Sequence, residues 1–151
     1  MTVGLGSFGK STYCKKNFRE ENIIAVDKLT GKNQFTIEHL LQYRELIIKA
    51  TKEKKEEIVL DFSHDEINER KNILSIIENK ELYNLHILVF YPTFKTYLKF
   101  HSLRTNRQII EEEKKKMQKL YDNFTIPSDE EFKQFGFKTI NIYLITFNEN
   151  I

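Results

Sequence analysis

The residues best suited to chemistry form one glycine-rich segment near the amino terminus. Residues 4–12 read Gly4-Leu5-Gly6-Ser7-Phe8-Gly9-Lys10-Ser11-Thr12. They match the pattern Gly-x-x-x-x-Gly-Lys-Ser/Thr, in which backbone N–H groups converge on phosphate oxygens without obstruction by a Cβ atom. The segment predicts a nucleotide-binding loop, formed by all of these residues, with ATP as its ligand. Lys10 would reach the β- and γ-phosphates, and Ser11 would bind Mg²⁺.

Two carboxylates follow short apolar runs that read as strands. Asp27 comes after the run 23–26, where a carboxylate can accept the proton of an attacking hydroxyl as a general base. Asp61 comes after the run 58–60, where a carboxylate can orient a substrate or order water around Mg²⁺. The alternative for either residue is a turn or helix cap, which aspartate also favours.

Two arginines lie between two segments of helical period. Arg104 or Arg107, on a flap over the phosphates, could stabilise charge on a transferred phosphoryl group. The alternative is a solvated surface, the common environment of arginine. The four histidines do not cluster and there is one cysteine, so we expect no metal site beyond Mg²⁺ carried with the substrate.

The elements that must position these residues alternate along the chain. Apolar runs predict strands at 2–3, 23–26, 58–60, 85–90 and 139–147, and helical periodicity predicts helices over 10–20, 36–52, 66–80, 93–103 and 107–122. The pattern predicts a single α/β domain over 1–151, a three-layer sandwich with a five-stranded parallel sheet and a helical lid. Ligands of such sheets bind beyond the carboxyl ends of the strands. Only three residues precede Gly4, so the first strand must be short. Thr36 is a plausible helix start, although it does not begin a capping box.

Composition indicates the cell compartment of the protein better than its activity. The net charge is +2, which gives no general reason to expect a nucleic-acid or membrane partner. The single cysteine excludes an intramolecular disulfide. No apolar run approaches the roughly 20 residues of a spanning helix, and no secretion signal is visible. We therefore expect a soluble cytoplasmic protein.

The order of these features resembles the P-loop kinases of the polynucleotide 5′-hydroxyl kinase group over nearly the whole chain. Their opening Gly-x-x-Gly-x-Gly-Lys-Ser-Thr corresponds to Gly4–Thr12, and their general-base aspartate corresponds to Asp27. Asp61-Phe62-Ser63-His64 resembles their Asp-x-Thr-Asn motif, which is followed by an arginine at the position of Arg70. Arg104-Thr105-Asn106-Arg107-Gln108-Ile109 resembles their lid, and Gly136-Phe137-Lys138-Thr139-Ile140 their last strand.

The resemblance implies an ATP- and Mg²⁺-dependent phosphotransferase. It implies that Lys10, Asp27 and the lid arginine (Arg104 or Arg107) act in catalysis, and that Asp61, Ser63 and Arg70 contact the substrate. Thr30 departs from the group, which has there an arginine that contacts the acceptor phosphate. The acceptor is thus a nucleic-acid 5′ end or a related small molecule. The alternatives are a nucleoside or metabolite kinase of the same superfamily, or an ATP-binding domain without transfer activity.

Overall fold

The computed structural model describes residues 1–30 and 36–147. Its strands are β1 (Thr2–Val3), β2 (Ile23–Ala25), β3 (Val59–Asp61), β4 (Asn84–Phe90) and β5 (Thr139–Ile145). Its α-helices are α1 (Lys10–Asn17), α2 (Asp27–Thr30), α3 (Ile37–Lys52), α4 (Ile67–Ser75), α5 (Phe94–Thr105) and α6 (Glu111–Asn123). Short 3₁₀ turns lie at η1 (Glu20–Asn22), η2 (Lys80–Leu82) and η3 (Asp129–Glu131).

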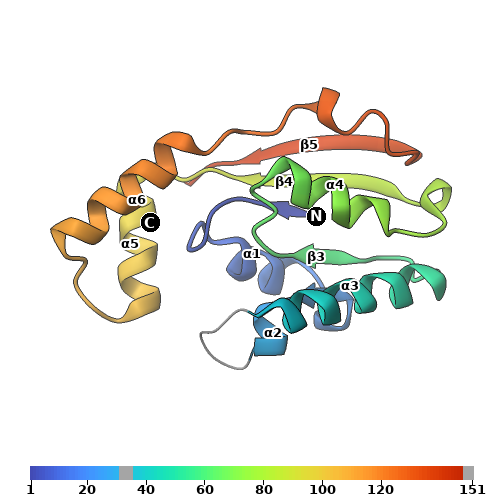
Figure 1. The fold of residues 1–151 in the computed structure, drawn as a ribbon, viewed down its shortest axis with the longest axis horizontal. Helices are drawn as coiled ribbons and strands as arrows, with labels where there is room; N and C mark the ends of the chain where they lie inside the picture. The colour runs from blue at the N-terminus through green and yellow to red at the C-terminus, as the bar shows by residue number, and fades with distance from the viewer. Residues whose placement is uncertain (31–35, 148–151) are drawn as a thin grey trace.

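The strands form two sheets, so the predicted three-layer sandwich around one five-stranded parallel sheet is wrong. One sheet has three strands in the order β1-β4-β5, and the other pairs β2 with β3. Neighbouring strands within each sheet are parallel. Figure 1 shows β4 and β5 side by side above β1, with β3 below it.

The division falls at β1 because this strand is too short to form a ladder on both sides. Thr2 and Val3 pair in register with Leu88 and Val89 of β4. Toward β3, the hydroxyl of Thr2 takes the place of a backbone ladder: it lies 2.9 Å from the carbonyl oxygen of Phe62 and accepts the Phe62 N–H at 3.3 Å. Two residues of backbone cannot supply a longer ladder, and side-chain hydrogen bonds therefore join the two sheets.

Alternation along β3 places two packing layers on opposite faces of the strands. Leu60 belongs to the main core, with Tyr43 and Ile47 of α3 and Leu74 of α4. Its neighbour Val59 packs instead in a small cluster with Cys14 of α1 and with β2 residues. Successive side chains of a strand point to opposite faces, so α1 lies on one side and α4 on the other.

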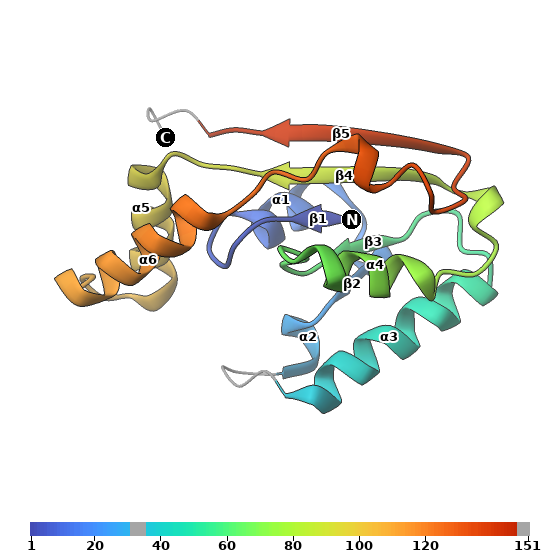
Figure 2. The ribbon, with the colours of Figure 1, turned by 45° about the horizontal axis from the view of Figure 1, so that its top comes forward.

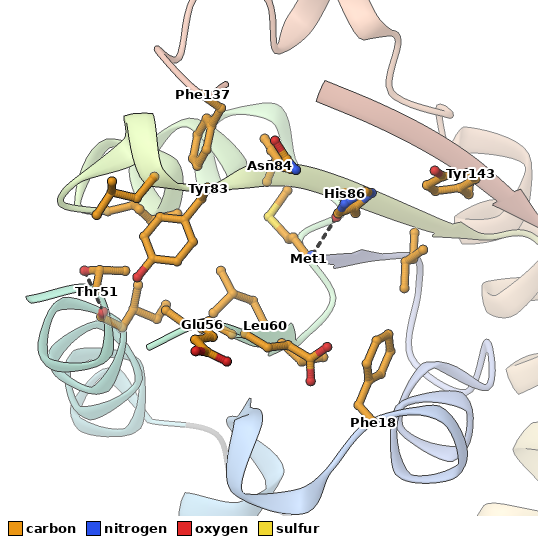
Figure 3. A pocket seen from close by; sticks show the side chains of 18 residues that line it. Met1, Phe18, Thr51, Glu56, Leu60, Tyr83, Asn84, His86, Phe137 and Tyr143 are labelled. Atoms are coloured by element: carbon orange, nitrogen blue, oxygen red, sulfur yellow. Dashed lines mark hydrogen bonds between the residues drawn. The ribbon is translucent and has the colours of Figure 1, made fainter. Parts of the chain in front are cut away.

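The short first strand also leaves a cavity of about 500 Å³ at the amino-terminal ends of β3 and β4. Figure 3 shows Met1, Leu60, Tyr83 and His86 around it. Its lining contains none of the residues that the sequence predicts to act on phosphate. The cavity therefore lies away from the glycine-rich segment.

Helix α3 begins after Thr36, as predicted, but the prediction that Thr36 does not begin a capping box is wrong. The side chain of Thr36 accepts a hydrogen bond from the backbone N–H of His39 at 3.4 Å. The ring of His39 in turn accepts the backbone N–H of Thr36 at 3.2 Å. These reciprocal bonds form a capping box, with histidine in the position usually held by Glu or Gln.

Helices α5 and α6 form a hairpin beyond the carboxyl end of β4, at the same end of the molecule as the glycine-rich segment (Figures 1 and 2). Met117 of α6 and Tyr97 of α5 pack in one apolar cluster with Leu5 and Phe8. The hairpin thus rests directly on that segment. Among the helices in the described ranges, none is long and apolar enough to cross a membrane.

Candidate functional site

Gly4–Gly9 forms a tight turn between β1 and α1, and its two end positions require glycine. A Cβ atom on Gly4 would lie 2.9 Å from the carbonyl oxygen of Phe90, and the φ of Gly4 is 151°. Gly9 has a φ of 88°, and a Cβ there would lie 3.2 Å from the ring of Phe147. Gly4 therefore excludes other residues by contact and by backbone conformation, and Gly9 disfavours them mainly by its positive φ.

Ser7 stands where the resembling kinases have a glycine, and its backbone conformation is one that favours glycine. Their pattern has its second glycine at this position, whereas here the glycine stands one residue earlier, at Gly6. Ser7 has a φ of 64°, in the left-handed region that favours glycine. The chain therefore places a strained serine at the centre of the loop.

Phe8 anchors the loop in the apolar cluster below it. Its side chain is fully buried and meets the ring of Tyr97 edge-on at 4.9 Å and that of Phe124 at 5.6 Å. Leu5 is also buried. These two side chains hold the turn in place, so they can contribute to nucleotide binding only through their backbone, whereas Gly6 and Thr12 are exposed.

Lys10 is enclosed by the turn that precedes it. Its Nζ donates to the carbonyl oxygens of Gly4 at 2.8 Å and Leu5 at 2.7 Å, and the residue is 7% exposed. Burial lowers the pKa of Lys10 to about 8, against the opposing effect of Asp61 and other carboxylates. The amine thus lies inside the curve of the loop, where the pattern requires a phosphate-binding lysine.

Asp61 lies next to Ser11, as a magnesium site of this type requires. Asp61 is 6% exposed, and helix α1, which carries Ser11, contacts strand β3, which ends at Asp61. Burial raises the pKa of Asp61, while the Ser11 hydrogen bond and the charge of Lys10 oppose that rise. Among the described residues, its Oδ1 atom has no hydrogen-bond partner.

These two oxygen donors fit Mg²⁺, which binds carboxylate and hydroxyl oxygens and keeps several waters or phosphate oxygens. The described residues include no group of three His, Cys, Asp or Glu that could hold a metal ion by themselves. A bound Mg²⁺ would therefore complete its coordination with water and phosphate.

Asp27 lies close enough to this group to act on it electrostatically. It is the first residue of α2 and is exposed. Its charge contributes to the rise in the pKa of Asp61 and opposes the fall in the pKa of Lys10. The structure brings these three charged groups together, while the role of Asp27 as general base stays a prediction.

The structure separates the two candidate lid arginines. Arg104 reaches the loop, because a Cβ on Gly6 would lie 3.9 Å from Arg104 Nη1, and its charge helps to lower the pKa of Lys10. Arg107 instead donates two hydrogen bonds of 2.7 Å to the carboxylate of Glu113. Of the two arginines, Arg104 is therefore the one that lies beside the loop, and its predicted contact with a phosphate stays a prediction.

The segment after Asp61 is occupied by structural contacts. Arg70 is buried, and its Nη1 donates to the carbonyl oxygens of His64 and Asp65, both at 2.8 Å. Its Nη2 donates to Glu131 at 2.9 Å. The carbonyl oxygen of Ser63 accepts the N–H of Gly4. The structure gives Arg70 and Ser63 fixing roles, and their predicted contacts with substrate stay predictions.

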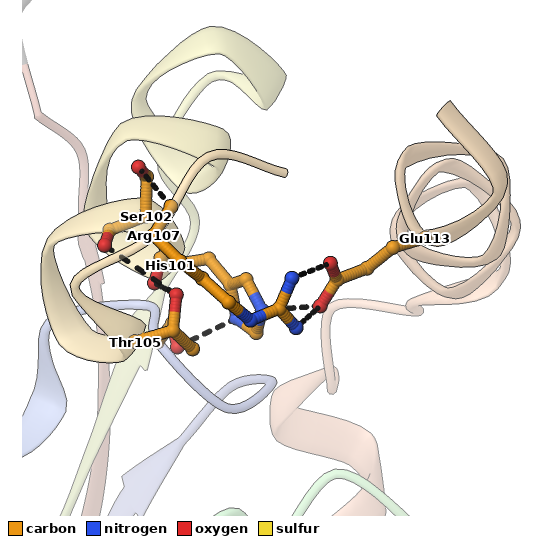
Figure 4. A network of polar contacts seen from close by, with 6 residues as sticks. His101, Ser102, Thr105, Arg107 and Glu113 are labelled. Carbon is orange, nitrogen blue, oxygen red and sulfur yellow. Dashed lines mark hydrogen bonds and ion pairs between the residues drawn. The ribbon is translucent and has the colours of Figure 1, made fainter. Parts of the chain in front are cut away.

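Two residues of the site were missed from the sequence. These are His101 of α5 and Glu113 of α6. His101 lies between Ser7 and Glu113, with its Nδ1 3.3 Å from the Ser7 hydroxyl and its Nε2 3.0 Å from the carboxylate (Figure 4). The available signal was spacing, since His101 and Arg104 are three residues apart on one helix and so share a face.

The arrangement combines a buried amine, a metal-type oxygen pair, an exposed carboxylate and an arginine around one glycine-rich turn. Such a set can bind a polyphosphate and stabilise its transfer. No protein-family model and no curated protein matches this sequence, so its function can be inferred only from these residues.

Proposed function

We propose that the protein transfers the γ-phosphate of ATP, with Mg²⁺, to a hydroxyl group. The observation that carries this proposal is the convergence of Lys10 and the Ser11–Asp61 pair within the glycine-rich turn. Each group alone has a structural explanation. Together they supply a cation for phosphate oxygens and a hard-metal site beside it, which is what phosphoryl transfer requires.

The chain's own residues would divide the work as follows. Lys10 would exchange its two carbonyl partners for phosphate oxygens. Arg104, beside Gly6, would neutralise charge that develops on the transferring group. Asp27 would accept the proton of the attacking hydroxyl. Ser11 and Asp61 would hold Mg²⁺, which would supply positive charge to neutralise the phosphate.

The charge beside the loop favours a small neutral or cationic acceptor over a nucleic-acid 5′ end. Asp27, Asp61 and Asp65 all act on Lys10. Glu66 and Glu69 line a hollow of about 360 Å³ between α3 and α4, together with one cation, Arg44. Burial, with the nearby Asp65 and Glu66, raises the pKa of Glu69 to about 7, as expected where negative charge accumulates.

Two cations that the resemblance would place near a polynucleotide acceptor do not serve that purpose here. The charge of Arg70 is paired with Glu131, and position 30 carries threonine where the resembling group has arginine. A phosphodiester chain would therefore meet mainly carboxylates here, which repel it. An amino alcohol or a sugar would not be repelled.

The test is transfer of label from γ-labelled ATP with Mg²⁺. Parallel reactions would contain a 5′-hydroxyl oligonucleotide, a panel of sugars and nucleosides, and a panel of amino alcohols. Lys10→Met removes the buried amine and keeps the apolar stem, and Lys16→Ala removes an exposed lysine of the same helix as a matched control. We expect label in a small hydroxyl compound with wild type and Lys16→Ala, and none with Lys10→Met.

Other outcomes are informative. Label in the oligonucleotide would support phosphate transfer to a hydroxyl group and refute our choice of a small acceptor. Tight ATP binding without transfer to any compound would indicate an ATP-binding domain that lacks transfer activity. Equal ATP binding by wild type and Lys10→Met would refute the nucleotide site itself.

A further inference from the structure

Four polar side chains connect the phosphate-binding turn to the α5–α6 hairpin. In order they are Ser7 in the turn, His101 in α5, Glu113 in α6 and Arg107 between the two helices. Figure 4 shows the last three of them. His101 and Glu113 are both partly exposed, with side chains 23% and 22% exposed. The connection therefore runs from the hairpin to the centre of the turn.

The chemistry of Glu113 fixes the orientation of the histidine ring. Arg107 and His101 hold the pKa of Glu113 below its usual range, so this side chain is a carboxylate that only accepts hydrogen bonds. Nε2 of His101 must then carry a proton and donate to it. The Nδ1 atom of the same ring is thereby directed at the Ser7 hydroxyl, 3.3 Å away.

Arg104 shares the face of α5 that carries His101. Residues three apart on a helix are neighbours on its surface, and Arg104 is one turn after His101. Where His101 meets Ser7, Arg104 Nη1 lies 3.9 Å from the position that a Cβ on Gly6 would occupy. The contact between His101 and Ser7 thus helps to set the distance between Arg104 and the neighbouring Gly6.

We propose that His101 is a positioning residue that, by binding Ser7, holds Arg104 over the γ-phosphate site. The proposal rests on the proposed function, since it presumes that the turn binds ATP. It also gives a reason for a serine at a φ of 64°, where glycine would be unstrained. The hydroxyl that reaches His101 requires a side chain at this strained position.

The test is the preference of the full chain for Mg·ATP over Mg·ADP, measured as two dissociation constants by calorimetry. ADP lacks the γ-phosphate, so a group that acts only on that phosphate changes ATP binding alone. Damage to the fold or to the turn would weaken the binding of both nucleotides together. The preference therefore separates positioning of Arg104 from a merely structural role.

The two variants at position 101 differ in which ring nitrogen of His101 their side-chain amide replaces. His101→Gln places its amide near the former Nε2 and keeps a partner for Glu113, but loses Ser7. His101→Asn places its amide near the former Nδ1 and keeps Ser7. Ser7→Gly removes the hydroxyl without adding backbone strain, and Leu103→Ala, at a position 69% exposed on the same helix, is the matched control.

We expect Arg104→Ala, His101→Gln and Ser7→Gly each to lower the ATP preference about 10-fold, the usual size of a lost hydrogen bond to a charged group. His101→Asn and Leu103→Ala should stay within about 3-fold of wild type. Because His101 acts through Arg104, the double variant of His101→Gln and Arg104→Ala should be no worse than Arg104→Ala.

Three results would overturn the inference: an unchanged preference in His101→Gln, equal loss of ATP and ADP affinity, or additive losses in the double variant. The proposed function is tested separately by Lys10→Met, which should lose both nucleotides. If Lys10→Met loses both nucleotides while His101→Gln binds them like wild type, the nucleotide site is supported and the positioning role of His101 is refuted. If wild type binds neither nucleotide, both proposals fall.

Discussion

Two arginine–carboxylate pairs of nearly the same geometry occupy very different surroundings. Arg70 and Glu131 form a two-pronged pair between α4 and η3, with side chains only 5% and 9% exposed. Arg107 and Glu113 form another between the ends of the α5–α6 hairpin, with side chains 51% and 22% exposed. The same chemistry thus occurs once in the interior and once at the surface.

The difference assigns different tasks to the two pairs. Removing one partner of a buried pair leaves an uncompensated charge in a poorly hydrated place, so the pair must remain closed. An exposed pair is replaced by water at little cost and can open. The buried pair therefore fixes the segment that leads into β5, whereas the exposed pair can open at little cost.

The largest expected effect comes from breaking the buried pair. Glu131→Ala should lower the free energy of unfolding by about 3–5 kcal/mol, because it leaves the buried Arg70 guanidinium without its carboxylate partner. Urea unfolding followed by circular dichroism measures this. Glu130→Ala, which removes an exposed carboxylate of the same turn paired with Lys133, should change little. Similar midpoints for the two variants would contradict the comparison.

A neutral buried pair tests whether burial or charge sets the cost. Tyr43 Oη lies 3.1 Å from His64 Nε2, and the other ring nitrogen lies 2.8 Å from the carbonyl oxygen of Thr2. Burial lowers the pKa of His64 to about 3, so the ring is neutral. Tyr43→Phe should cost about 1–3 kcal/mol in urea unfolding, because Nε2 loses its donor. Tyr143→Phe, at an exposed tyrosine, is the control, and equal stability of both variants would refute the role of burial.

Glu69, the neighbour of Arg70, offers an intermediate case that depends on pH. Its pKa is about 7 in the folded protein and about 4.5 when unfolded, so the folded state binds more protons between these values. Stability should therefore fall as pH rises through this window, by on the order of 1 kcal/mol after allowance for partial exposure. Glu69→Gln should flatten the profile of urea midpoint against pH. A variant profile as steep as that of wild type would show that another group titrates.

The smallest effect is expected at the exposed pair. Arg107→Ala should leave the urea midpoint unchanged, because an exposed ion pair contributes little. It should, however, speed amide hydrogen exchange in the first turn of α6, and about 0.5 M salt should speed it similarly in wild type. Lys116→Ala, which breaks an exposed pair within α6, is the control. A large loss of stability in Arg107→Ala would remove the contrast between the two pairs.

Elements with long periodic patterns were predictable from the sequence, and their assembly was not. The helix expected over 36–52 is α3, and the strand expected over 85–90 is β4 with one more residue at its start. The helix expected from 107 begins only at Glu111, because 106–110 turn the chain between α5 and α6. The single sheet failed at β1, where two residues cannot form ladders with both neighbours.

The site could be predicted where a local motif defines it and not where distant segments meet. Lys10 and Ser11 follow from the glycine pattern, and the pairing of Ser11 with Asp61 follows the expectation that strand ends converge. Nothing local distinguishes Arg104 from Arg107, since the choice depends on Glu113 in the next helix. In the same way, Arg70 meets Glu131 from 61 residues away, and no spacing rule indicates that contact.

The enclosed amine of Lys10 has a consequence for calorimetry. With a pKa near 8, part of the population lacks this proton in mildly alkaline buffer. A polyphosphate placed against the amine favours its charged form, so association should draw in a fraction of a proton from the buffer. The observed heat would then include the ionisation heat of that buffer and should differ between Tris and phosphate at one pH. The size of that difference reports how many protons Lys10 gains.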